Sequence, residues 1–99
     1  MKKVAVIHTA FEKTPRTVAF VEVEDNVTVD DALEYAYRWT QNIMDSWSKK
    51  GPCDGNEFVT VVGDMSDGYG LRSTSVGDQI LVGTKKYTVA PMGFEEMVT

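Results

Sequence analysis

The chain has 99 residues, 15 of them acidic and 10 basic, so its formal net charge at pH 7 is −5. This length has room for one small domain, and a hydrophobic fraction of 42% can fill a core, which excludes a disordered chain. A single cysteine excludes a disulfide framework, and one histidine with one cysteine cannot form a structural zinc site without carboxylates. The negative charge argues against non-specific binding to nucleic acid or to anionic membranes.

The first segment is predicted to be a β-strand rather than a targeting signal. The apolar run that ends at Ile7 is too short for a signal peptide, and a charged stretch follows it closely. No apolar run reaches the ~20 residues that cross a membrane. The unpaired Cys53 fits a reducing compartment. We therefore expect a soluble, cytoplasmic protein without membrane contact.

Two strands are predicted before the first helix. Residues 3–9 are rich in valine, isoleucine and threonine, which favour strands. Residues 17–24 end in an alternation of valine and glutamate, which places the acids on one face and the valines on the other.

A helix is predicted from about Val29 to Ser46. Thr28 is a suitable N-cap, because its hydroxyl can accept a hydrogen bond from the amide of Asp31. Lys49-Lys50-Gly51-Pro52 provides the signals that end a helix. The positions that follow a helical spacing are Val29, Leu33, Ala36, Thr40, Ile43 and Trp47.

The second half of the chain predicts further strands. Residues 58–62 are short and β-branched, and residues 79–82 and 87–90 read as a hairpin with a turn through 83–86. Gly93-Phe94 is expected to pack the tail back on the domain. The sequence thus predicts a single α+β domain over residues 1–99, in which one helix packs on a four- to five-stranded mixed or antiparallel sheet in a β-grasp-like order.

The sequence gives little support for a catalytic site or a metal site. His8 and Cys53 could form a nucleophile–base pair, but nothing in the sequence brings them together. The acidic loop from Asp64 to Gly70 has no glutamate at the twelfth position of a calcium loop, where Ser75 stands. We therefore expect no catalytic residue, no metal and no cofactor, and keep a small hydrolase built on Cys53 as a third hypothesis.

An acidic stretch marks one candidate contact surface. Between Thr17 and Glu34 the chain has six acids and no lysine or arginine. Such a face can bind a basic partner protein, or it can simply be a solvated strand face followed by helix-start charges. The acids predicted to form this face are Glu22, Glu24, Asp25 and Asp30.

Aromatic side chains mark a second candidate surface. Tyr35 and Tyr37 flank the apolar stripe of the predicted helix, so we expect them to be partly exposed. The helical spacing of Trp47 favours core packing over base stacking, although this side chain and Tyr69 are kept as candidate contact residues.

The last third of the chain carries a family resemblance. It reads Gly-Leu-Arg-Ser-Thr-Ser-Val-Gly-Asp over residues 70–78, followed by Gln79-Ile80, Tyr87-Thr88-Val89 and Gly93-Phe94. Over residues 70–97 this pattern resembles the YodL-like domain of bacteriophages and mobile elements, with Gln79 in place of the usual apolar residue. The resemblance implies a phage or mobile-element origin, and hence the cytoplasm of a host bacterium. It supplies no catalytic residues.

The same motif has two physical interpretations. Arg72 can pair with Asp78 or with an acid across the loop, Gly77 can adopt a positive φ, and the hydroxyls of Ser73, Thr74 and Ser75 can fix a turn. Alternatively, Arg72 and these hydroxyls can bind an anion. The first interpretation is structural, and the second makes the 72–78 turn an RNA- or nucleotide-binding site.

The leading functional hypothesis is a non-enzymatic, phage-type accessory protein that acts by protein–protein contact on a host factor, for example as an inhibitor of a defence or transcription component. The contact surface is expected within residues 48–75, because long connections in small domains are often functional. RNA or nucleotide binding through the 72–78 turn is the alternative. Nucleic acid is otherwise not expected as a partner, and the chain is expected to be a monomer or a small homo-oligomer.

Overall fold

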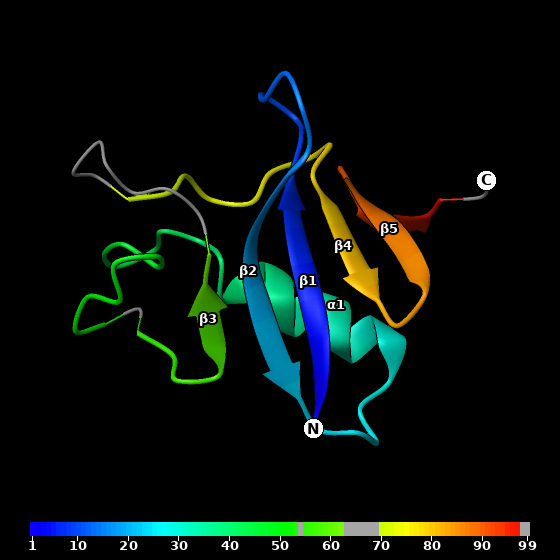
Figure 1. Cartoon of the computed structure of the whole chain (residues 1–99), viewed down its shortest axis with the longest axis horizontal. Helices are drawn as coiled ribbons and strands as arrows, with labels where there is room; N and C mark the ends of the chain where they lie inside the picture. Colours follow the sequence, from blue (N-terminus) through cyan, green and yellow to red (C-terminus); the bar gives the residue numbers. More distant parts are fainter. Residues whose placement is uncertain (54, 63–69, 98–99) are drawn as a thin grey trace.

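In the part of the chain that the computed structural model describes, one helix packs against one face of a six-stranded antiparallel sheet (Figure 1). The structure describes residues 1–53, 55–62 and 70–97. The elements are β1 (Lys2–His8), β2 (Arg16–Val23), α1 (Val29–Arg38), β3 (Val59–Val61), β4 (Gln79–Val82), β5 (Lys85–Ala90) and β6 (Gly93–Glu96). The predicted α+β class and single small domain are confirmed.

The strands lie in the order β3-β2-β1-β4-β5-β6, and each neighbouring pair is antiparallel. The expected sheet of four to five strands is therefore wrong in number, and no mixed pairing occurs among the described strands. The additional strand is β6, which pairs with β5 across the two-residue turn of Pro91 and Met92. Gly93 has a φ of 94°, a value that favours glycine, and this lets the tail turn back as a paired strand.

Helix α1 begins as predicted but ends early. The Thr28 hydroxyl accepts a hydrogen bond from the amide of Asp31 at 3.2 Å, which confirms the N-cap. The predicted end near residue 46 is wrong, because the helix ends at Arg38. The hydroxyl of Thr40 donates to the carbonyl of Ala36 at 2.8 Å, and the side-chain amide of Gln41 donates to that of Tyr37 at 3.0 Å. These side chains satisfy carbonyls of the last turn that have no partner within the helix.

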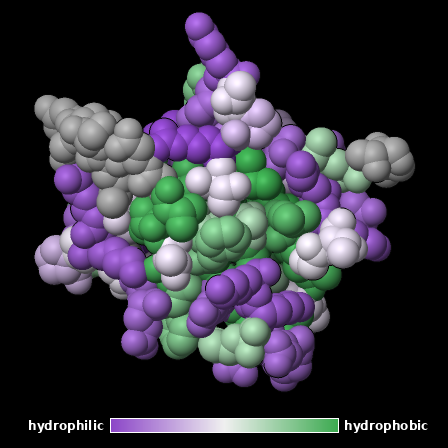
Figure 2. Space-filling model, viewed as in Figure 1, coloured by the Kyte–Doolittle hydropathy of each residue, from purple (hydrophilic) through white to green (hydrophobic). Residues whose placement is uncertain are grey.

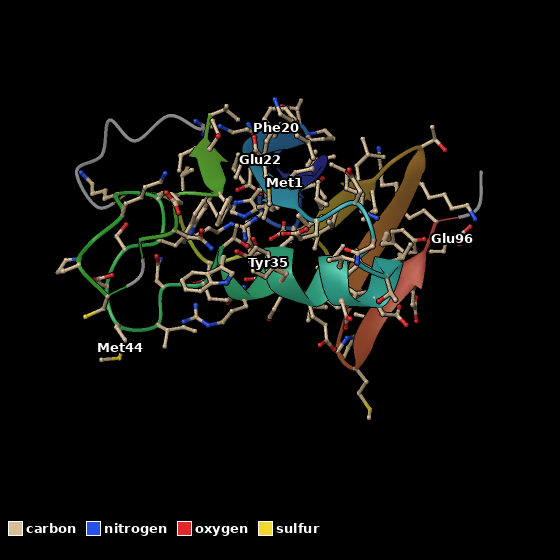
Figure 3. All side chains as sticks on the ribbon, turned by 90° about the horizontal axis from the view of Figure 1, so that it is seen from below. Met1, Phe20, Glu22, Tyr35, Met44 and Glu96 are labelled. Atoms are coloured by element: carbon tan, nitrogen blue, oxygen red, sulfur yellow. The ribbon has the colours of Figure 1, made fainter. Side chains whose placement is uncertain are left out.

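The core lies between α1 and the inner face of the sheet. Val4 and Val6 of β1 are fully buried, as are Leu33 and Ala36 of α1. The sheet curls at its far side, so that β6 comes beside the helix (Figure 3). There the rings of Tyr37 and Phe94 meet edge to face, with their centroids 6.0 Å apart.

The chain between α1 and β4 closes one end of the core. Trp47 is 1% exposed, and its indole N–H donates to the carbonyl of Arg72 at 2.9 Å. The amide of Leu71 donates to the hydroxyl of Ser48 at 2.7 Å. Within residues 48–75, where the contact surface is expected, Ser48, Leu71 and Thr74 are buried, so these side chains are not available for contact.

Candidate functional site

Asp78 is the centre of the motif singled out in the sequence. Its carboxylate has no exposed surface and accepts hydrogen bonds from the amides of Thr9, Ala10 and Ser75 at 2.8 to 2.9 Å. The guanidinium of Arg72 adds a two-pronged contact, with Nη1 2.7 Å from Oδ2 and Nη2 2.8 Å from Oδ1. One carboxylate thus joins the β1–β2 loop to the segment before β4.

The guanidinium of Arg72 uses all of its donors inside the protein. Two N–H groups bind Asp78, two bind Glu12 through Nε and Nη2, and one binds the carbonyl of Ser73, which accounts for the five that a guanidinium has. The ring of Phe11 lies 4.8 Å from the guanidinium carbon. The predicted pairing of Arg72 is confirmed with both an acid in the motif and an acid across the loop.

The charges in this cluster are held in their ionised forms. Burial by itself raises the pKa of Asp78, but hydrogen bonds from Arg72 and from the amides outweigh burial and hold the pKa far below its usual value. The hydrogen bond to Asp78 raises the pKa of Arg72, and the hydrogen bond from Arg72 lowers the pKa of Glu12. One positive charge therefore faces two negative charges, so the cluster has no surplus of positive charge.

The neighbouring motif residues also have structural roles. Gly77 adopts a φ of 97°, as predicted. The hydroxyl of Ser73 accepts from the amide of Asn42 at 2.8 Å, and that of Ser75 donates to the carbonyl of Ser73 at 3.2 Å. Thr74 is 1% exposed and lies in the core. Since these hydroxyls and the guanidinium have partners within the chain, the geometry supports the structural interpretation of the motif.

His8 and Cys53 lie in different environments. His8 is 1% exposed, with Nε2 2.9 Å from the hydroxyl of Thr74 and 4.0 Å from the carboxylate of Asp78. Burial lowers the pKa of His8, opposed by the charge of Asp78. Cys53 is exposed, and its amide is bonded to Asp45 at 2.8 Å. Each residue thus contacts other groups, and none of these contacts joins His8 to Cys53 as a nucleophile–base pair.

The aromatic candidates separate into buried and accessible side chains. Trp47 is buried, whereas Tyr35 and Tyr37 are half-buried on α1. Tyr69 lies outside the described residues, as do residues 64–68 of the loop that resembles a calcium site. Within the described ranges, no group of three His, Cys, Asp or Glu side chains is placed to hold a metal ion.

The acidic stretch and Tyr35 meet at a pocket of about 320 Å³. The pocket lies at the end of the sheet where Met1, Glu22 and Tyr35 gather (Figure 3). Its walls are mostly apolar side chains, and three carboxylates stand at it. The lining residues are Met1, Glu22, Val23, Glu24, Val27, Asp31, Tyr35 and Phe58.

Two of the predicted acids line this pocket and two do not. Glu22 and Glu24 are lining residues, together with Asp31, which was not among the acids predicted to form this face. Asp25 is instead paired with the amino group of Met1 at 3.5 Å. Asp30 is exposed in the first turn of α1, where the helix dipole favours a negative charge.

A second candidate surface is the face of the sheet that α1 does not cover. Side chains alternate along a strand, so Val4 and Val6 of β1 point to the helix while Ala5 and Ile7 point away from it. Ala5 lies opposite Phe20 of β2 and Leu81 of β4. We call Ala5, Ile7, Phe20 and Leu81 the bare face. The view onto this side of the sheet shows an apolar patch surrounded by hydrophilic residues (Figure 2).

The sequence of β1 contains a signal for the bare face, which is not among the predicted surfaces. β1 has an unbroken apolar run from Val4 to Ile7, which is typical of a strand with apolar groups on both of its faces. A chain with one predicted helix can cover one of these faces. The other face then needs a partner or stays in contact with water.

Comparison with protein-family models, with curated proteins and with solved structures finds no match to this chain. The resemblance of residues 70–97 to the YodL-like domain therefore stays a prediction. In the described part of the chain, no helix has the length and apolar character that crossing a membrane requires.

Proposed function

We propose that this chain is a non-enzymatic, phage-type accessory protein that binds a host protein through the bare face. The observation that carries the proposal is the apolar centre of this face, where Phe20 keeps 36% of its surface exposed beside Ala5 and Leu81. Contiguous apolar patches rimmed by polar residues are typical of protein-binding surfaces. Inhibition of a defence or transcription component would be the consequence of such binding.

The size of the face suits a protein partner. The molecule measures 36 × 32 × 22 Å, and the bare face lies on a broad side, viewed along the short axis (Figure 2). A stable interface takes about 800 Å² from each partner, which this side can supply. Net charge favours a different protein over a second copy, because two chains of −5 each repel one another.

The remaining hypotheses receive less support. RNA or nucleotide binding at the 72–78 turn would need donors from Arg72, and these are all bonded within the chain. A hydrolase would need a base beside Cys53, whereas His8 is buried against Thr74. The β-grasp relationship is also a proposal, supported by the order of a hairpin, a helix and further strands.

Site-specific photo-crosslinking in host-cell extract tests the proposal. In the test protein, a photo-reactive phenylalanine analogue replaces Thr60, which lies opposite Phe20 in the β2–β3 register. In the control protein, the same analogue replaces Glu34, which is exposed on α1. We expect one host protein to be crosslinked from position 60 and not from position 34, and to be lost with Phe20→Lys. Equal crosslinking from both positions, no crosslink from position 60, or a crosslink that survives Phe20→Lys would overturn the proposal.

A further inference from the structure

We propose that the pocket beside Tyr35 binds the side chain of an arginine on the partner protein. This inference rests on the proposed function and adds to it the chemistry of one contact. Glu22 connects the two surfaces: it lies two residues after Phe20 on the same face of β2, and it also lines the pocket. A protein seated on the bare face therefore reaches the pocket at its edge.

The pocket has more negative than positive charge around it. Among the described residues, the carboxylates of Glu22, Glu24 and Asp31 have no ion-pair or hydrogen-bond partner, and no lysine or arginine lines the pocket. Two positive charges lie at this end of the sheet, fewer than the four carboxylates of Glu22, Glu24, Asp25 and Asp31. The ammonium of Lys2 donates to the carbonyl of Val27 at 3.0 Å, and the amino group of Met1 faces Asp25.

The Tyr35 wall of the pocket is held in place before any ligand arrives. The side-chain amide of Asn56 donates to the hydroxyl of Tyr35 at 2.9 Å, and its carbonyl oxygen accepts from the amide of Phe58 at 2.9 Å. One asparagine thus links the helix to the segment that leads into β3. A preformed wall lowers the entropic cost of binding.

An arginine side chain matches this combination better than other groups do. Its methylene stem can lie on Val23 and Val27, and its planar guanidinium can stack on the rings of Tyr35 and Phe58 while it binds carboxylates in a fork. A lysine ammonium is more strongly hydrated and lacks the planar group that stacks. The volume of about 320 Å³ is at the small end of ligand pockets, which suits one long side chain.

Titration with short peptides tests the pocket without any partner protein. The probes are acetyl-Gly-Arg-Gly-amide, the lysine peptide and the citrulline peptide, which keeps the shape of arginine without its charge. Amide chemical shifts are followed by NMR at low salt. We expect the arginine peptide to bind weakly, to shift Val23, Val27 and Tyr35, and to bind about threefold tighter than the lysine peptide.

Charge-removing variants make the test specific. The triple variant Glu22→Gln, Glu24→Gln, Asp31→Asn should weaken the arginine peptide about tenfold, whereas Glu95→Gln with Glu96→Gln on β6 should leave it unchanged. Shifts of equal size with citrulline, tighter binding of lysine, or no shift at the pocket would overturn this inference. The host-protein crosslink at position 60 is read separately, so loss of the arginine site leaves the bare-face proposal standing. Peptide binding at the pocket without the crosslink would overturn the assignment of the arginine to a partner on the bare face.

Discussion

Arg72 and Asp78 are joined by two short hydrogen bonds, 2.7 Å from Nη1 to Oδ2 and 2.8 Å from Nη2 to Oδ1. The Asp78 side chain is fully buried, and the Arg72 side chain keeps 28% of its surface exposed. This pair holds the loop before β4 against the β1–β2 loop. Its role is to fix this end of the sheet.

Removing the carboxylate of Asp78 should strongly destabilise the fold. Asp78→Ala leaves a partly buried guanidinium and three amides without their acceptor, so we expect the free energy of unfolding to fall by about 3–5 kcal/mol. Urea denaturation measures this loss. Glu96→Ala, which removes an exposed carboxylate 4.0 Å from Lys85, should change the value by less than about 0.5 kcal/mol. Similar losses in both variants would contradict the role given to Asp78.

Stability should fall in two steps as the pH is lowered. His8 has a depressed pKa in the folded protein, so below its unfolded value near 6.5 the unfolded chain takes up a proton first and stability declines. Asp78 and Glu12 also have depressed pKa values. Their contribution to the free energy of unfolding is complete above about pH 4–5 and is lost as the pH falls further.

Urea midpoints between pH 8 and pH 3 measure the two steps. His8→Gln should remove the decline between about pH 7 and pH 5 and leave the acid step in place. A wild-type protein whose stability is flat from pH 8 to pH 5, or a variant with an unchanged slope, would contradict the burial of a neutral His8.

Gly77 should tolerate a methyl group less well than Gly83. Both have a positive φ, 97° and 63°, but a Cβ at Gly77 would lie 3.2 Å from the Cβ of Ala10, and one at Gly83 would meet nothing within 4 Å. We expect Gly83→Ala to cost about 1 kcal/mol from backbone strain, and Gly77→Ala to cost more. Thermal denaturation of both variants compares the two costs, and equal costs would show that the contact with Ala10 does not matter.

Single-stranded RNA should not bind at the 72–78 turn. The donors of Arg72 are all used, and the cluster that it forms with Asp78 and Glu12 has a net negative charge. An electrophoretic mobility shift at low salt, where phosphate contacts are strongest, is the measurement. A shift that disappears with Arg72→Ala, in a variant shown to be folded by circular dichroism, would restore the RNA-binding hypothesis.

Local signals predicted most of the elements. The alternation in β2, the N-cap at Thr28 and the hairpin of β4 and β5 are determined by neighbouring residues, and each was found close to its place. The early end of α1 lies next to Thr40, whose hydroxyl donates to the last turn and accepts from Thr74, 34 residues later in the chain. Such a long-range contact leaves no local trace in the sequence.

The candidate site was predicted in part. The pairing of Arg72 with Asp78 follows from their opposite charges and their short separation in the sequence. Glu12 is 60 residues away in the sequence, and only the folded β1–β2 loop brings it to Arg72. The sequence shows the acids near Tyr35 as a stretch without lysine or arginine. The pocket that they line also needs Phe58, which comes from a distant segment of the chain. The bare face appears only once the single helix is seen to cover one side of the sheet (Figure 1).

The affinity of the crosslinked host protein for three purified forms tests the bare face most directly. These forms are the wild type, Phe20→Lys, and Met92→Lys, which changes a side chain 96% exposed in the turn between β5 and β6. We expect Phe20→Lys to raise the dissociation constant at least about tenfold, and Met92→Lys to leave it unchanged. Wild-type affinity in Phe20→Lys, or equal weakening in both variants, would contradict binding through this face.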